Sequence, residues 1–235
     1  MTDRVVLITG GSKGIGRAMA EAFRDAGYSV AATYRSGAVP DGVLGVECDV
    51  TSQDSVDAAF QQVEEKLGSV DVLVANAGVT NDGLLMRMSD EDWAQTIDTN
   101  LTGTFRVVRR ASRQMTRARF GRMILISSVV GLMGNPGQVN YASSKAALVG
   151  MARSITREIG VRGVTCNVIA PGFIDTDMTK VLGSEVIKGY EQRIPAGRLG
   201  SVDDVAAAAL FLAGDGAGYI SGAVIPVDGG LGMGH

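Results

Sequence analysis

Short apolar runs alternate with amphipathic segments along the whole chain. The apolar runs are rich in branched residues and only a few positions long, which is typical of strands covered on both faces of a sheet. Between them, apolar residues recur every three to four positions, which predicts helices with one buried face. We expect strands at residues 4–9, 28–33, 43–47, 70–75, 121–127, 162–169 and 223–227, and helices at about 14–26, 52–67, 89–118, 141–160 and 201–213.

This alternation predicts repeated strand–helix–strand units and therefore a parallel sheet with helices on both faces. Right-handed crossovers then lead to an α/β, Rossmann-like, doubly wound fold with seven strands. The sequence contains no linker, repeat or low-complexity segment, so we expect one domain over residues 1–235. The least regular stretch is 174–200, which we interpret either as a mobile lid or as a surface excursion.

Composition narrows the functional classes. With 46% hydrophobic and 20% charged residues among 235, the chain can bury a core, and its net charge of −3 argues against nucleic acid or an anionic membrane as a partner. Cys48 and Cys166 lack metal-ligand spacing, and the one histidine is His235, so we expect no metal site and two buried thiols. The first expected strand leaves no room for a signal peptide, and no apolar run could span a bilayer. We predict a cytoplasmic protein.

A glycine-rich loop, GGSKGIG, follows the first expected strand and opens a helix. Glycines permit a tight turn and let backbone N–H groups approach a pyrophosphate, while the helix N-terminus adds partial positive charge. This context predicts a dinucleotide site formed by Gly10, Ser12, Lys13, Gly14, Ile15 and Gly16.

The end of the second strand favours NADP(H) over NAD(H). An NAD site usually places an acid there to bind the ribose hydroxyls, but this strand ends in Tyr34 and Arg35, and the first acid is Asp41. Arg35, with Lys13 nearby, offers cations for a 2′-phosphate. A solvated loop charge is the other interpretation of Arg35.

Two more strand ends face the same predicted crevice. Asp49 and Val50 follow one strand, and Asn76, Ala77 and Gly78 follow the next. Such residues are ordinary turn formers, but their place at the carboxyl ends of strands favours contact with the cofactor.

The pattern S-x12-Y-x3-K joins Ser128, Tyr141 and Lys145. Tyr141 and Lys145 are one helical turn apart and share a face, so we expect the ammonium to lower the pKa of the phenol. A tuned phenol exchanges protons well with an oxygen that gains or loses hydride. Because Tyr-x-x-x-Lys alone is common on surface helices, the pattern gains meaning only beside the glycine-rich loop.

Together with Asn100 and Pro171-Gly172, these motifs resemble the short-chain dehydrogenases/reductases over essentially the whole chain. Segments at 84–88, 100–107, 120–131, 140–148, 170–179 and 219–230 are similar to the 3-oxoacyl-[acyl-carrier-protein] reductases of type II fatty acid synthesis. The ending GLGMGH and the stretch at 151–159 resemble the branch that serves very long acyl chains, including mycolic acid precursors. That branch can carry a bulky aromatic where this chain has Leu132-Met133.

The resemblance implies NADPH-dependent reduction of a 3-oxoacyl-[acyl-carrier-protein] to the (3R)-3-hydroxyacyl product. It assigns Tyr141 as proton donor, Ser128 as the group that orients the substrate oxygen, Lys145 as the holder of the nicotinamide ribose and Asn100 as the anchor of a relay water. It adds cofactor contacts at Pro171, Gly172, Ile174 and Thr176.

Arginines are concentrated on one predicted helix, within an arc of about 100°: Arg106, Arg109, Arg110, Arg113 and Arg117. They form either a solvated or subunit-facing side, or a surface that steers an acidic acyl carrier protein. By resemblance, Arg119 and Arg162 grip that carrier, and the chain forms a homotetramer through the helices near 101–118 and 141–160 and the last strand.

Two alternatives stay open. The chain could reduce another ketone, such as a polyketide, sugar, steroid or small diketone, because the shared chemistry does not separate these substrates. It could also be a non-catalytic NADPH-binding scaffold. The presence of Asn100, Ser128, Tyr141 and Lys145 together argues against a scaffold.

Overall fold

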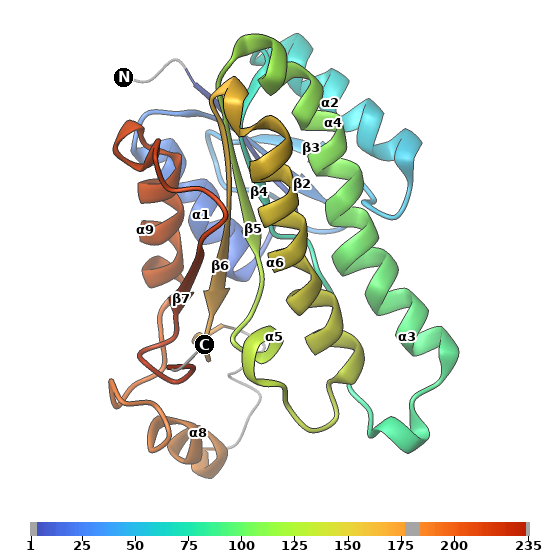
Figure 1. The fold of residues 1–235 in the computed structure, drawn as a ribbon, viewed down its shortest axis with the longest axis vertical. Helices are drawn as coiled ribbons and strands as arrows, with labels where there is room; N and C mark the ends of the chain where they lie inside the picture. Colours follow the sequence, from blue (N-terminus) through green and yellow to red (C-terminus); the bar gives the residue numbers. More distant parts are fainter. Residues whose placement is uncertain (1–3, 177–183, 234–235) are drawn as a thin grey trace.

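The computed structural model describes residues 4–176 and 184–233, and seven parallel strands form its sheet in the order β3-β2-β1-β4-β5-β6-β7 (Figure 1). The predicted α/β fold is therefore confirmed. The strands are β1 Val5–Ile8, β2 Ser29–Tyr34, β3 Leu44–Glu47, β4 Val70–Ala75, β5 Gly121–Ile126, β6 Val164–Pro171 and β7 Val224–Val227.

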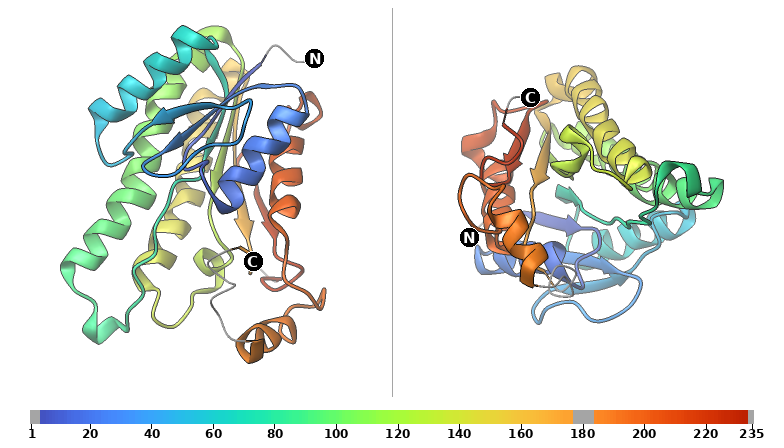
Figure 2. Two further views of the ribbon diagram at one scale, coloured as in Figure 1. Left: turned by 180° about the vertical axis from the view of Figure 1, so that it is seen from behind. Right: turned by 90° about the horizontal axis from the view of Figure 1, so that it is seen from below.

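Helices cover both faces of the sheet (Figures 1 and 2). They are α1 Gly14–Asp25, α2 Gln53–Lys66, α3 Asp90–Ile97, α4 Gly103–Ala118, α5 Val130–Met133, α6 Val139–Ile159, α8 Ser184–Glu191 and α9 Val202–Ala213. Phe23 of α1 and Leu212 of α9 lie in one apolar core, whereas Phe60 of α2, Met115 of α4 and Leu148 of α6 lie in the core of the other face. Burial on both faces explains why the central strands are mostly apolar.

The strand order reverses next to β1, which pairs with β2 on one side and with β4 on the other. The crossover helices therefore leave in opposite directions at this point, and a crevice opens beyond the carboxyl ends of β1 and β4. The glycine-rich loop follows β1 and residues 76–78 follow β4, so the fold brings two predicted binding segments to the same edge.

The single helix expected over 89–118 is wrong, because the structure breaks it into α3, a π-helical turn at Asp98–Thr102 and α4. A π-turn inserts an extra residue and rotates the side chains around it. Asn100 lies in this turn and is fully buried, with its amide turned toward Val79. The helix is therefore broken where Asn100 makes its tertiary contact with Val79. Helical periodicity in the sequence does not reveal this break.

Helices α5 and α8 are not expected from the sequence pattern. Helix α5 is a single turn, and α8 lies inside the stretch 174–200 that lacked regular periodicity. Residues 177–183 of that stretch are outside the described residues, so its interpretation as a lid stays a prediction.

Candidate active site

A cleft of about 590 Å³ runs along the carboxyl ends of the strands. Ser128, Tyr141 and Lys145 line it, while Asn100 lies behind it and is fully buried. Every residue predicted to bind the cofactor also lines this cleft: Gly10, Ser12, Lys13, Gly14, Ile15, Gly16, Tyr34, Arg35, Asp49, Val50, Asn76, Ala77, Gly78, Tyr141, Lys145, Pro171, Gly172, Ile174 and Thr176.

The glycine-rich loop is held by its neighbours in the sheet. Gly10 has a φ of +70°, its N–H donates to the Thr33 hydroxyl at 3.1 Å, and its carbonyl accepts from the Asn76 amide at 3.1 Å. Gly16 lets α1 approach this loop, since a Cβ there would lie 2.1 Å from the Gly10 carbonyl oxygen. The Asn76 side chain therefore holds the glycine-rich loop in place. From the sequence we expected this residue only to contact the cofactor.

The N-terminus of α1 is open to an anion. Lys13 is its N-cap residue and forms no side-chain cap, and the first turn carries no acidic residue. Orphan N–H groups at such a helix end favour a phosphate. The loop and the helix end therefore fit the pyrophosphate of a dinucleotide.

The end of the cleft formed by β2 and β3 combines two cations with one carboxylate. Arg35 is exposed there and lines the cleft with Lys13, and no ion pair among the described residues includes Arg35. Asp49 accepts the Thr51 N–H at 2.9 Å and the Thr51 hydroxyl at 2.8 Å, and these bonds lower the pKa of its carboxyl. This end can hold an adenosine with a 2′-phosphate.

Ser128, Tyr141 and Lys145 converge at the other end of the cleft. Ser128 follows β5, and its hydroxyl accepts the Val130 N–H at 3.1 Å. Tyr141 and Lys145 project from the first turns of α6, with Lys145 Nζ 5.7 Å from the Tyr141 ring centroid. The same ammonium donates to the Ile126 carbonyl at 2.8 Å. The expected shared helix face is confirmed.

The predicted direction of the Tyr141 pKa is wrong. Desolvation in the cleft wall raises the pKa of the phenol above its ordinary value, the Ser128 hydroxyl opposes this in part, and the Asp82 carboxylate adds to it. Burial also lowers the pKa of Lys145 from 10.5 to about 8. The arrangement therefore favours a neutral phenol, which is the form that donates a proton.

Asn100 is bound by protein partners on every side. Its carbonyl oxygen accepts the Val79 N–H at 2.8 Å, and its amide donates to the Val79 carbonyl at 2.9 Å and to the Ser144 hydroxyl at 3.1 Å. Ser144 in turn donates to the Tyr141 carbonyl at 2.7 Å. Asn100 thus links the loop after β4 to the first turn of α6, and its role as a water anchor stays a prediction.

Several residues of the site escaped sequence reasoning. Asp82, Asn135 and Gln138 form a hydrogen-bonded chain at the cleft, and Phe173 stacks on Tyr190 of α8 at 4.0 Å. They lie in loops or in the irregular stretch, where no periodicity marks them. One local signal was present nearby. The sequence SDED at 89–92 has the pattern of a helix capping box and marks where the loop after β4 ends and α3 begins.

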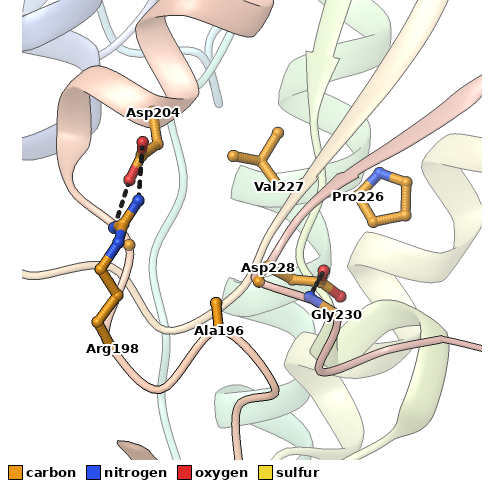
Figure 3. A pocket seen from close by; sticks show the side chains of 9 residues that line it. Ala196, Arg198, Asp204, Pro226, Val227, Asp228 and Gly230 are labelled. Atoms are coloured by element: carbon orange, nitrogen blue, oxygen red, sulfur yellow. Dashed lines mark hydrogen bonds and ion pairs between the residues drawn. The ribbon is translucent and has the colours of Figure 1, made fainter.

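A second hollow, of about 350 Å³, lies beside the end of β7 and does not share this chemistry (Figure 3). Its charges are already satisfied. Arg198 pairs with Asp204 at 2.8 Å, and the Asp228 carboxylate accepts the N–H groups of Gly230 and Gly232. We therefore place the candidate active site in the larger cleft.

Most of the arginine face on α4 is structural. Arg106 pairs with Asp98 at 2.9 Å, Arg110 with Glu64 of α2 at 2.7 Å, and Arg109 donates to Gln53 of α2. These pairings favour the structural interpretation of these three arginines, and steering of an acidic carrier by this helix face stays a prediction.

Arg119 and Arg162 are both exposed and lie at the amino ends of β5 and β6, on the edge of the sheet opposite the cleft. The two turns touch, because a Cβ at Gly163 would lie 2.4 Å from the Arg119 carbonyl oxygen.

A family model described as enoyl-(acyl carrier protein) reductase matches residues 10–232. The chain belongs to the short-chain dehydrogenase/reductase family. Among curated relatives in this family, the 3-oxoacyl-[acyl-carrier-protein] reductase MabA of Mycobacterium tuberculosis (strain ATCC 25618 / H37Rv) is 56% identical over 233 residues, covering 99% of this chain and 94% of the relative. The reductase FabG of Haemophilus influenzae is 46% identical over 98% of this chain and 99% of the relative, and FabG of Escherichia coli (strain K12) is 45% identical over 98% of each.

Within the described residues, we find no group of three or more metal-ligating side chains. No described helix is both long and apolar enough to cross a membrane.

Proposed function

We propose that this protein is an NADPH-dependent 3-oxoacyl-[acyl-carrier-protein] reductase that forms (3R)-3-hydroxyacyl products in fatty acid elongation in the cytoplasm. One observation carries the proposal: a single cleft joins a dinucleotide-binding loop to the Ser128, Tyr141 and Lys145 side chains. The relatives with 45–56% identity bear the name of this activity.

The chemistry divides between the cofactor and the protein. When bound, NADPH supplies a hydride to the C3 carbonyl carbon. Tyr141 donates its phenolic proton to the oxygen that becomes negative, and the Ser128 hydroxyl holds that oxygen in place. Lys145 binds the nicotinamide ribose and keeps a positive charge near the phenol as the proton leaves. Tyr141 is neutral at neutral pH and so carries the proton that it donates, because burial raises the pKa of its phenol.

Selection of NADPH rests on Arg35 and Lys13. Both line the adenosine end of the cleft, and a guanidinium matches a phosphate in shape and charge. No acid stands at the end of β2 to bind the unphosphorylated ribose. Turnover with NADH close to that with NADPH would contradict this assignment.

Carrier docking and assembly belong to the same proposal. Arg119 and Arg162 together present positive charge at the amino edge of the sheet, whereas the cleft lies at the carboxyl edge. We propose that a carrier held by one chain serves the cleft of a neighbouring chain in the proposed homotetramer. Ala142, Ala146, Ala147 and Gly150 of α6 suit close approach of a second copy.

The test is oxidation of NADPH with acetoacetyl-CoA, run beside NADH and beside a long-chain 3-oxoacyl thioester. A trans-2-enoyl thioester is included because the matching family model is described as an enoyl reductase. We expect turnover of the 3-oxo substrates with NADPH, and loss of nearly all turnover with retained NADPH binding in Tyr141→Phe. Reduction of the enoyl substrate alone would make the protein an enoyl reductase, and NADPH binding without any turnover would favour another ketone or a scaffold.

A further inference from the structure

The loop after β4 is joined to the start of α6 by a chain of side chains that the proposed mechanism does not use. Gln138 Nε2 donates to both oxygens of Asp82, at 3.0 and 2.9 Å, and its Oε1 accepts from the Asn135 amide at 2.9 Å. The Thr80 hydroxyl also donates to Asp82. All four residues line the cleft beside Tyr141.

The backbone strengthens the same connection. The Gly83 N–H donates to the Gly137 carbonyl at 2.8 Å, so the two loops share both side-chain and main-chain bonds. Gln138 is the N-cap residue of α6, and its carbonyl accepts the Ala142 N–H at 2.7 Å. Any movement of Gln138 therefore moves the helical turn that carries Tyr141.

We propose that Asp82 is a positioning residue for Tyr141: through Gln138 it fixes the first turn of α6, and its carboxylate places a negative charge beside the phenol. This inference rests on the proposed reductase function. It deepens that function by assigning a role to a residue outside the four proposed catalytic groups.

The charge of Asp82 opposes that of Lys145 at the phenol. Lys145, on α6 itself, lies 5.7 Å from the Tyr141 ring centroid, and a cation there favours the phenolate. Asp82, in the loop after β4, favours the neutral phenol. Tyr190, on α8, is a further titratable group that lines the cleft, where its ring stacks on Phe173. Lys13, Arg35, Cys48 and Asp49 lie with the first three strands at the adenosine end. Asp82 therefore adds to the desolvation that already makes Tyr141 harder to ionise.

The variant Asp82→Asn removes the charge and keeps the size of the side chain. We expect it to lower the pKa of Tyr141 by roughly half a unit, since solvent screens an exposed carboxylate. The phenolate absorbance of each protein, minus that of its Tyr141→Phe counterpart, measures this pKa without a substrate. Glu91→Gln, an exposed charge change on α3 away from the cleft, is the matched control and leaves the titration in place.

Gln138→Ala tests the positioning role separately from the electrostatic one. It removes the hydrogen bonds between Gln138 and Asp82 but leaves the charge of Asp82 in place. We expect kcat to fall severalfold with the KM for NADPH unchanged, and the alkaline limb of the kcat/KM profile to shift in Asp82→Asn.

An Asp82→Asn titration that matches the parent protein would overturn the electrostatic role, and a Gln138→Ala enzyme with full kcat would overturn the positioning role. The absorbance titration decides the first point even if the chain reduces a different substrate.

Discussion

A fully buried amide next to the proposed catalytic tyrosine determines how α6 begins. The Asn140 amide donates to the Asn81 carbonyl at 2.9 Å and to the Thr96 hydroxyl at 3.0 Å, and its oxygen accepts the Tyr141 N–H at 2.7 Å. The side chain thus ties α6 to α3 and to the loop after β4. Nothing in the sequence distinguishes Asn140 from an ordinary polar residue at a helix start.

Asn140→Ala should cost about 2–3 kcal/mol of unfolding free energy, because it leaves buried partners without hydrogen bonds. It should also lower kcat roughly tenfold or more, because Tyr141 loses its fixed position. Urea unfolding and steady-state kinetics measure the two effects. Ser143→Ala, exposed on the same helix, is the control and should stay within about 0.5 kcal/mol of the parent. A kcat in Asn140→Ala equal to that of Ser143→Ala would contradict the positioning role.

Lys145 makes stability depend on pH in a specific window. Its pKa is about 8 in the folded protein and 10.5 when unperturbed, so between these values the unfolded chain binds more protons. The contribution of this group to the free energy of unfolding therefore rises with pH across that window, by up to roughly 3 kcal/mol.

The measurement is urea unfolding of the parent and of Lys145→Met at pH 7, 8.5 and 10. We expect the difference, parent minus variant, to increase with pH. A constant difference would mean that the buried ammonium keeps an ordinary pKa.

At the scale of elements, the contact between the glycine-rich loop and α1 depends on one missing side chain. A Cβ at Gly16 would lie 2.1 Å from the Gly10 carbonyl oxygen and 2.6 Å from the Asn76 amide nitrogen. Backbone on one side and a hydrogen-bonded amide on the other leave no room for adjustment, so a substitution must push the helix away from the loop.

Gly16→Ala should therefore destabilise the protein by about 1–3 kcal/mol and weaken NADPH binding, which thermal unfolding and fluorescence titration measure. Gly189→Ala is the matched control, since Gly189 lies within α8 with nothing within 4 Å of an added Cβ. It should be neutral or stabilising by up to about 1 kcal/mol. Equal affinity for NADPH in the two variants would show that the loop does not need this close approach.

On helix α4, the sequence pattern predicted the buried face but not the partners of the charged face. The 3.6-residue period predicts an apolar face of Leu101, Thr104, Val108, Ala111 and Met115. The last four are buried, and Leu101 is partly buried against the same core. The charged face of α4 was ambiguous, because periodicity says that arginines point outward without saying what they meet. Asp57, Glu64 and Gln53 of α2 answer that question, and they come from another part of the chain.

At the scale of the whole molecule, the proposed docking residues and the cleft lie at opposite edges of the sheet. We expect Arg119→Glu combined with Arg162→Glu to weaken kcat/KM for a carrier-bound substrate far more than for acetoacetyl-CoA, because only the carrier is steered by these charges. Arg113→Glu combined with Arg117→Glu makes the same charge change on the exposed side of α4 and tests whether the remaining arginines of that helix also steer the carrier. Equal losses on both substrates would contradict docking at this edge.

The sequence by itself determined the fold class, all seven strands to within two residues, and the cofactor-binding loop and Ser128, Tyr141 and Lys145, which line one cleft. It did so because strand and helix periods, glycine-rich turns and fixed spacings are local properties of the chain. Only the tertiary structure decided the break at Asn100, the partners of the arginine face, the link between Asp82 and Gln138, and the direction of the Tyr141 pKa. Each of these depends on desolvation or on contacts between segments distant in sequence, which no local pattern contains.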